Sequence, residues 1–181
     1  MISKRTVHDL DTGVDGKRAL TRVDFNVPIK NGVVGDDSRI RAAIPTIRHL
    51  RSLGCRVILL SHLGRPKGKG FEEPYSLKPV HKLLEKLLGN PVTFIADPSS
   101  AASVATTKTM TRGAVALVEN TRFYAGEEKN DPATAKLFAA LGDFYVNDAF
   151  GAAHRAHAST EAVARLLKPA VAGLLMEKEL E

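Results

Sequence analysis

Short apolar runs of strand length alternate with longer segments of helical periodicity along the sequence. The strand-like runs fall at residues 18–23, 56–61, 92–95, 114–118, 144–146 and 170–172. Segments with helix signals separate and follow them, at residues 38–54, 76–89, 97–110, 131–142, 160–167 and 174–181. Repeated strand–helix units place buried parallel strands in one sheet between helices. Because the chain has 181 residues, we predict a single α/β domain with three α/β/α layers and a doubly wound, parallel, Rossmann-like sheet.

Several helix ends are marked by residues with known capping preferences. Asp131 followed by Pro132 predicts a helix start, because Asp caps free amides and Pro suits the first turn. Ser38 predicts the cap of an earlier helix, and Gly89 predicts the end of another. Pro45 lies within the helix that starts near Ser38, so we expect a kink there or two helical pieces in series.

The composition excludes several classes of protein. No apolar run approaches the ~18 residues that span a bilayer, and the N-terminal residues lead into no apolar stretch typical of a signal peptide. We therefore expect a cytoplasmic protein with no membrane partner. The single cysteine, Cys55, rules out an internal disulfide and a cysteine-rich zinc site. We expect Cys55 to pack as a small apolar residue.

Positive charge is concentrated in the first half of the chain. The formal net charge is +6, and residues 1–90 carry 17 basic and 9 acidic side chains, against 9 and 11 in residues 91–181. A basic half is compatible with a nucleic acid, an anionic membrane, a small acidic ligand or plain solubility. The positions of the arginines are therefore more informative than their number.

Polar residues follow the predicted strands at the points where ligands bind in open parallel sheets. They come from four loops and from the start of the helix after the first strand: Asp24, Asn26, Arg39, His62, Arg65, Arg122, Asn147, Asp148, His154, Arg155 and His157. Guanidinium groups bind phosphate and carboxylate through paired hydrogen bonds. We therefore predict a small-anion site at this edge. The alternative for any single arginine is that it lies in a loop and only solvates the surface.

Other interpretations of these segments have weaker support. Residues 64–69 (GRPKGK) resemble a phosphate loop in composition but lack the Walker spacing, and no G-x-G-x-x-G motif occurs. His154 and His157 lack a third fixed ligand, so we expect no metal site. Ser61 and His62 are neighbours on a strand and point to opposite faces, which disfavours a nucleophile–base pair. Few aromatic residues and no binding motif disfavour nucleic acid.

Eight segments, in order along the chain, closely resemble the N-terminal half of the phosphoglycerate kinase family. They are residues 22–28 (RVDFNVP), 38–40 (SRI), 61–66 (SHLGRP), 119–123 (ENTRF), 126–131 (GEEKND), 146–151 (VNDAFG), 153–159 (AHRAHAS) and 172–180 (AGLLMEKEL). Members of this family transfer a phosphoryl group reversibly between ATP and 3-phosphoglycerate in glycolysis, giving 1,3-bisphosphoglycerate and ADP. The resemblance thus implies a kinase, an enzyme that transfers phosphate to a carboxyl group.

The resemblance also assigns roles to individual residues. It implies that Asp24 and Asn26 orient the substrate, and that Arg39 is catalytic and reaches the transferring phosphoryl group. It implies that the non-transferring phosphate is held by a basic cluster. The implied substrate-binding residues are Asp24, Phe25, Asn26, Arg39, His62, Leu63, Gly64, Arg65, Arg122 and Arg155.

The family is about twice as long as this chain, and its nucleotide half has no counterpart here. The resemblance implies a 3-phosphoglycerate-binding domain at residues 1–173 and the start of an interdomain helix at residues 174–181. Mg-ATP or Mg-ADP would bind to the missing C-terminal domain, and hinge closure would join the two. We expect this chain to be a monomer that binds 3-phosphoglycerate without turnover, the alternative being a stand-alone anion- or nucleic-acid-binding module.

Overall fold

The computed structural model describes residues 5–181; the N-terminal residues 1–4, used above in judging the absence of a signal peptide, lie outside them. Within residues 5–181, six parallel strands form one sheet in the order β5-β6-β4-β1-β7-β8. They are β1 (Arg18–Arg22), β4 (Arg56–Leu60), β5 (Val92–Ile95), β6 (Val115–Val118), β7 (Phe144–Asn147) and β8 (Ala170–Ala172). The chain adds β4, β5 and β6 on one side of β1 and then β7 and β8 on the other. The predicted doubly wound parallel sheet is confirmed.

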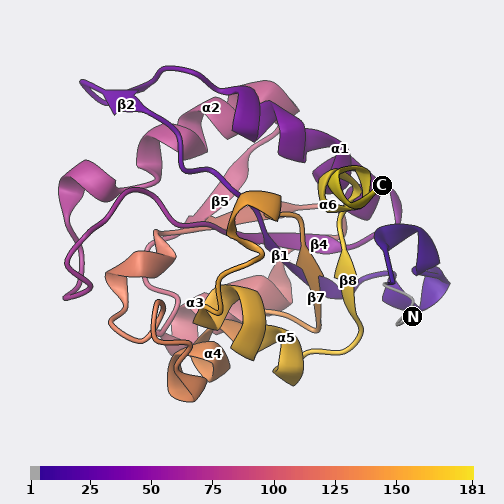
Figure 1. Cartoon of the computed structure of the whole chain (residues 1–181). Coiled ribbons are helices and arrows are strands. Elements are labelled where there is room, and N and C mark those ends of the chain that lie inside the picture. The colour runs from indigo at the N-terminus through magenta and orange to yellow at the C-terminus, as the bar shows by residue number, and fades with distance from the viewer. Residues whose placement is uncertain (1–4) are drawn as a thin grey trace.

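Helices cover both faces of the sheet, which confirms the three layers (Figure 1). One face carries α1 (Ser38–Ser52), α2 (Lys78–Leu88) and α6 (Leu174–Leu180). The other face carries α3 (Ala101–Thr109), α4 (Pro132–Ala139) and α5 (Val163–Leu166). None of the helices in residues 5–181 has the length and apolar character that crossing a bilayer requires.

The strands are apolar on both sides because each faces a layer of helices. In β4, Leu59 belongs to the apolar cluster beneath α1 and α2, whereas Leu60 belongs to the cluster on the opposite face. Both side chains are fully buried. Successive residues of a strand point to opposite faces, so one continuous apolar run builds two cores. Cys55 is also buried, as predicted.

Most predicted element boundaries hold to within a few residues, with two corrections in α1. Asp37 occupies the N-cap position without a capping side-chain bond, and Ser38 is the first helical residue, so the predicted Ser38 cap is wrong. The Ser38 amide instead donates to Asp36 Oδ1 at 3.0 Å. The helix runs through Pro45 as one element, so the alternative of two separate pieces is also wrong. A proline removes only one helical hydrogen bond, and the buried face of α1 holds the helix across it.

A small hairpin between β1 and α1 was not predicted. It pairs β2 (Ile29–Lys30) with β3 (Val33–Val34) through Asn31 and Gly32. Both turn residues have positive φ, 53° and 74°. An Asn-Gly pair between short β-forming runs is the sequence signal that identifies this turn.

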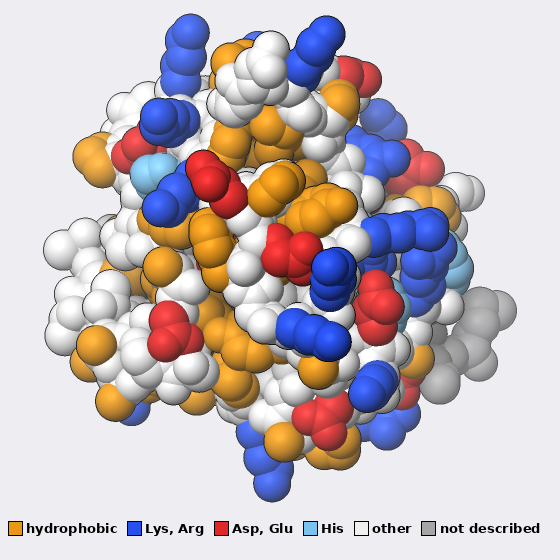
Figure 2. All heavy atoms as spheres, turned by 90° about the vertical axis from the view of Figure 1, so that its left-hand side faces the viewer, with side chains coloured by type: hydrophobic (Ala, Val, Ile, Leu, Met, Phe, Trp, Pro, Cys, Tyr) orange, Lys and Arg blue, Asp and Glu red, His pale blue; other side chains and the backbone are white. Residues whose placement is uncertain are grey.

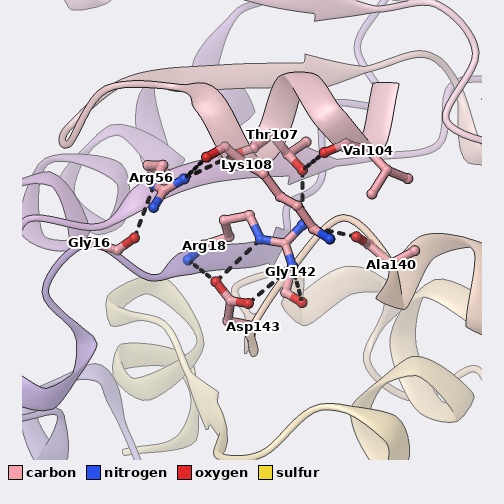
Figure 3. A network of polar contacts seen from close by, with 9 residues as sticks. All are labelled: Gly16, Arg18, Arg56, Val104, Thr107, Lys108, Ala140, Gly142 and Asp143. Carbon is pink, nitrogen blue, oxygen red and sulfur yellow. Dashed lines mark hydrogen bonds and ion pairs between the residues drawn. The ribbon is translucent and has the colours of Figure 1, made fainter. Parts of the chain in front are cut away.

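Two arginines tie the helices to the sheet at the amino ends of the strands (Figure 3). Arg18 is nearly buried and donates to Asp143, to Thr107 Oγ1 and to the carbonyls of Ala140 and Gly142 at 2.9–3.2 Å. Arg56 similarly donates to carbonyl oxygens near the end of α3. Arg18 thus joins α3, the residue after α4 and the turn before β7 at the end of the molecule opposite to the carboxyl ends of the strands.

Candidate functional site

A polar pocket lies at the carboxyl ends of β1, β4, β6 and β7. Its volume is about 280 Å³. The lining residues come from five segments of the chain: Asp24, Asn26, Arg39, His62, Gly64, Arg65, Arg122, Gly151, Ala152 and Arg155. Four guanidinium groups therefore converge on one hollow, as predicted for the strand-end residues. A larger hollow of about 680 Å³ lies between the β2–β3 hairpin and the segment around Phe71, but Lys78 is its single basic lining residue.

The loop after β1 and the start of α1 are joined across the pocket. Arg39 Nη1 donates to the Asn26 carbonyl at 3.0 Å and lies 3.3 Å from Asp24 Oδ2. The Arg39 side chain is 55% exposed, so this ion pair contributes little to stability. Arg39 is thus oriented by Asp24 while its guanidinium stays accessible to a ligand.

The loops after β4 and β6 are locked together by Asn120, which is fully buried. Its side-chain oxygen accepts from the amides of Leu63 and Arg122 at 3.2 and 3.0 Å, and its nitrogen donates to the carbonyls of Leu63 and Tyr75 at 2.7 and 3.0 Å. Gly64 connects the same loops to the first one, because its amide donates to Asn26 Oδ1 at 2.9 Å. These hydrogen bonds hold the loops of the pocket in place without involving the arginine side chains.

Arg122 and His62 form the buried part of the pocket. Arg122 Nη1 donates to the Gly64 carbonyl at 2.8 Å, and its Nε lies 3.2 Å from Glu128 Oε1. Burial lowers the pKa of Arg122, and Glu128 opposes that effect. Burial, followed by the charge of Arg22, lowers the pKa of His62 to about 2. His62 is therefore neutral at physiological pH, and the positive charge of the pocket belongs to the arginines.

Eight of the ten residues implied by the resemblance line the pocket, and two do not. The side chains of Phe25 and Leu63 are buried in the core cluster beneath α1 and α2. Their backbones still serve the site, since the Phe25 amide donates to Ser61 Oγ at 2.9 Å and Leu63 is bound by Asn120. In a strand-end loop, the residues between pocket-lining ones point into the core.

The other strand-end residues are dispersed. Asp148 turns away from the pocket and accepts from amides at the start of α6. His154 is exposed, and His157 is buried behind the loop. Within residues 5–181, no group of three or more His, Cys, Asp or Glu side chains is arranged to hold a metal ion.

Sequence reasoning missed four residues of the site. Gly151 and Ala152 line the pocket, but small residues in a loop carry no chemical signal. Arg22, at the end of β1, contacts His62. The sequence signal that could have identified it is an arginine at the end of an apolar run. Asn120 lies two residues after the end of β6, and its place near a strand end resembles that of the predicted residues.

A loop of glycine and basic residues, residues 64–70, borders the pocket. The Gly64 amide donates to Asn26 Oδ1, the Lys67 amide donates to Glu72 Oε2, and the Gly70 amide donates to the Phe123 carbonyl. A phosphate loop must present free backbone amides to its ligand. These three amides donate within the protein and are therefore not free to bind a phosphate.

Comparison with known proteins identifies the family. The family model described as phosphoglycerate kinase matches residues 7–181. The chain belongs to the phosphoglycerate kinase family. Phosphoglycerate kinase of Dictyoglomus turgidum is 55% identical over 181 residues, which cover 99% of this chain and 45% of that protein. The enzyme of Thermosynechococcus vestitus is 54% identical over 182 residues, with the same coverage.

Solved phosphoglycerate kinase structures share the fold. The structure from Coxiella burnetii superposes with a TM-score of 0.87 at 42% identity, over 98% of this chain and 43% of that one. The structure from Pyrococcus horikoshii gives 0.85 at 34% identity, over 97% of this chain and 44% of that one. The chain thus spans less than half the length of these relatives. The resemblance noted in the sequence is confirmed, and the matched part is the N-terminal domain of phosphoglycerate kinase.

Proposed function

We propose that this chain is the substrate-binding domain of phosphoglycerate kinase and that its strand-end pocket binds 3-phosphoglycerate. The observation that carries the proposal is the convergence of Arg39, Arg65, Arg122 and Arg155 on one pocket, in a chain of that family. 3-Phosphoglycerate carries a carboxylate and a phosphate of about −1.5 to −2 charge near neutral pH. Several guanidinium groups are the appropriate counterpart for such a ligand.

The pocket geometry suggests how the ligand is oriented. Arg122, with His62 beside it, forms the buried wall, whereas Arg65 and Arg155 are exposed at the rim. We place the non-transferring phosphate against these groups. Asp24 and Asn26 lie near Arg39 and would orient the hydroxyl and carboxylate end. Arg39 then neutralises charge where the phosphoryl group is transferred, and phosphoryl transfer requires mainly alignment and charge neutralisation.

The proposal assigns no nucleotide chemistry to this chain. Residues 1–173 form the phosphoglycerate-binding domain, and residues 174–181 begin the helix that leads to a nucleotide domain. Mg-ATP and Mg-ADP would bind to that second domain in a longer protein, with hinge closure bringing the two ligands together in the cytoplasm. The chain alone would be a monomer that binds 3-phosphoglycerate and does not turn over.

Calorimetric titration of the 181-residue chain with 3-phosphoglycerate tests the proposal. We expect saturation at one ligand per chain. Arg65→Gln and Arg155→Gln each remove one exposed cation from the rim and should weaken binding about tenfold, the loss expected for one charge-assisted hydrogen bond. Arg48→Gln removes the same charge from an exposed position nine residues beyond Arg39 on α1 and should leave binding unchanged.

Three outcomes would each contradict a part of the proposal. Equal losses in the Arg48→Gln and Arg65→Gln variants would mean that net charge, and not the pocket, attracts the ligand. Saturable binding of a single-stranded oligonucleotide without binding of 3-phosphoglycerate would favour the stand-alone module. That alternative has less support, because the face that carries the β2–β3 hairpin mixes Lys and Arg with Asp, Glu and apolar side chains (Figure 2). Sustained formation of 1,3-bisphosphoglycerate in a coupled assay with Mg-ATP would refute the expected lack of turnover.

A further inference from the structure

Arg22, the last residue of β1, is fully buried, and its guanidinium contacts His62, which lines the pocket. Its Nη2 lies 2.9 Å from His62 Nδ1, its Nε donates to Ser159 Oγ at 2.8 Å, and its Nη1 donates to the Val23 carbonyl. An arginine this deeply buried is rare unless its donors are satisfied. Each of the three nitrogens of Arg22 has one acceptor, supplied by Val23, His62 and Ser159.

The contact with Arg22 determines which nitrogen of His62 carries the proton. A guanidinium group only donates hydrogen bonds, so Nδ1 of His62 must accept and cannot itself be protonated. The proton of the neutral ring is then on Nε2. Within residues 5–181, Nε2 has no hydrogen-bond partner and is not among the fully buried polar atoms, and His62 lines the pocket. Nε2–H is therefore the donor available to a bound anion.

We propose that Arg22 is a positioning residue, which fixes His62 as a neutral imidazole that offers its Nε2–H to the anion in the pocket. The identity of that anion rests on the proposed function, whereas the state of the imidazole does not. His62 would act by directional hydrogen bonding, and the arginines would supply the charge.

The groups that most affect the pKa of His62 favour its neutral form. Arg22, Arg122, Arg155 and His157 are the charged or titratable neighbours, and each lowers the pKa of His62 in the same direction as its burial. A second cation beside Arg22 would be repelled in a poorly solvated site. The geometry of the Nδ1 contact and the surrounding positive charge therefore both favour the neutral imidazole of His62.

Arg22 is held in place by a buried acid that it does not touch directly. Ser159 accepts from Arg22 and donates from its hydroxyl to Glu127 Oε2 at 2.7 Å, and its amide donates to Glu127 Oε1 at 2.8 Å. Glu127 is fully buried. The carboxylate thus balances the charge of Arg22 through the serine, which keeps the guanidinium free to face His62.

Nitrogen-15 NMR of the histidine rings tests the inference on the unaltered chain without any ligand. Long-range nitrogen–proton correlations distinguish the two neutral forms from the cation, and loss of a signal in His62→Gln assigns the resonance. We expect the Nε2–H form of His62 alone, unchanged between pH 5 and 8. A ring protonated on Nδ1, or one that becomes a cation within this range, would overturn the inference.

Variants of Arg22 then test its role. In Arg22→Met, the His62 pattern should shift toward a mixture of the two neutral forms, and 3-phosphoglycerate should bind about tenfold more weakly. Arg22→Lys keeps a cationic donor and should restore the Nε2–H pattern. Arg18→Met is the matched control, because Arg18 is a nearly buried arginine at the opposite end of the same strand. It should lower stability without changing the His62 spectrum.

The outcomes separate this inference from the proposed function. An unchanged His62 pattern in folded Arg22→Met would refute the role of Arg22, even if 3-phosphoglycerate binds. Absence of 3-phosphoglycerate binding with the expected ring spectrum would refute the proposed ligand and leave the role of Arg22 standing. If Arg22→Met does not fold, the spectra of the unaltered chain and of Arg22→Lys decide the question.

Discussion

At Gly64, the backbone adopts a φ of 61° and passes so close to Tyr75 that a Cβ would lie 2.5 Å from a ring carbon. Both backbone groups of this residue serve the pocket. The amide donates to Asn26, and the carbonyl accepts from Arg122. Glycine is required here for two separate reasons, the left-handed conformation and the close approach of the ring.

We predict that Gly64→Ala weakens both folding and ligand binding. A non-glycine residue in the left-handed region costs about 1–2 kcal/mol, and the contact with Tyr75 adds to that cost. Gly89→Ala is the control, since Gly89 ends α2 with a φ of 71° but has open space around it. Urea unfolding should show a larger loss for Gly64→Ala. Calorimetry should show weaker 3-phosphoglycerate binding for that variant alone, and equal effects of the two substitutions would contradict the prediction.

Individual site residues were predictable where chemistry and position in the chain coincide. Arg65, Arg122 and Arg155 follow strands and carry a side chain suited to anions, so position and residue type lead to the same prediction. Arg22 was missed because an arginine inside an apolar run has no assignable partner until the fold brings His62 and Ser159 to it. Contacts between residues 40 to 137 positions apart, such as these, depend on the tertiary structure.

At the scale of elements, α6 is attached to the sheet through Asp148, which follows β7. Asp148 Oδ1 accepts from the amides of Leu175 and Met176 at 2.9 and 3.2 Å. A Cβ on Gly173 would lie 2.2 Å from the same oxygen, so the approach of the helix requires glycine there. Asp148 Oδ2 is buried without a hydrogen-bond partner in the described part of the chain. Asp148 thus connects the loop that lines the pocket with the first turn of α6.

We predict that Asp148→Asn increases stability in a pH-dependent way. Burial raises the pKa of Asp148 to about 6, and the neighbouring Thr46 side chain and the amides of Met176 and Leu175 only partly oppose this. Between about pH 4 and 6 the folded chain binds a proton that the unfolded chain has released, so this group lowers stability as the pH rises through that window. Asparagine carries no charge, retains the accepting oxygen and should therefore increase the free energy of unfolding by about 2 kcal/mol at pH 8.

The gain should be smallest at pH 4, where Asp148 is protonated in the folded chain and about half protonated in the unfolded chain. Urea unfolding of the unaltered chain and of Asp148→Asn at pH 4, 6 and 8 measures the difference between their free energies of unfolding. The titration of the other acidic groups is common to both proteins and cancels in this difference. Asp148→Ala removes the acceptor for the α6 amides and should lower stability at every pH. An Asp148→Asn variant that is less stable than the unaltered chain at pH 8 would show that the charge at the helix start outweighs its burial.

Elements were predictable from local signals and missed where those signals are short. Asp131 and Pro132 start α4 as predicted, with Asp131 Oδ2 accepting from the Thr134 amide at 2.9 Å. The β2–β3 hairpin has two residues in each strand, which is too few for an alternating pattern to be recognised. The Ser38 cap failed because the helix begins one residue earlier than that cap requires, with Asp37 at the N-cap position and the Ser38 amide bound to Asp36. Capping rules identify the region of a helix start more reliably than the residue.

At the scale of the whole molecule, the sheet joins two apolar clusters into one structure. Strands β1, β4, β6 and β7 each contribute residues to both clusters in alternation. Loss of apolar contacts on one face of the sheet therefore destabilises strands whose other side packs in the second cluster. This arrangement implies that residues 5–181 unfold as one cooperative unit, with neither layer of helices persisting alone.

Leu59→Ala and Leu60→Ala test this directly, because the two neighbours in β4 are fully buried on opposite faces. Each should lower the free energy of unfolding by about 2–5 kcal/mol. Hydrogen exchange measured by mass spectrometry should show α1 and α4 losing equal protection in either variant, although each leucine packs toward only one of these helices. Selective loss in α1 for Leu59→Ala and in α4 for Leu60→Ala would mean that the layers unfold separately. Cooperative loss would instead show that the chain, less than half the length of its relatives, carries a single folding transition of its own.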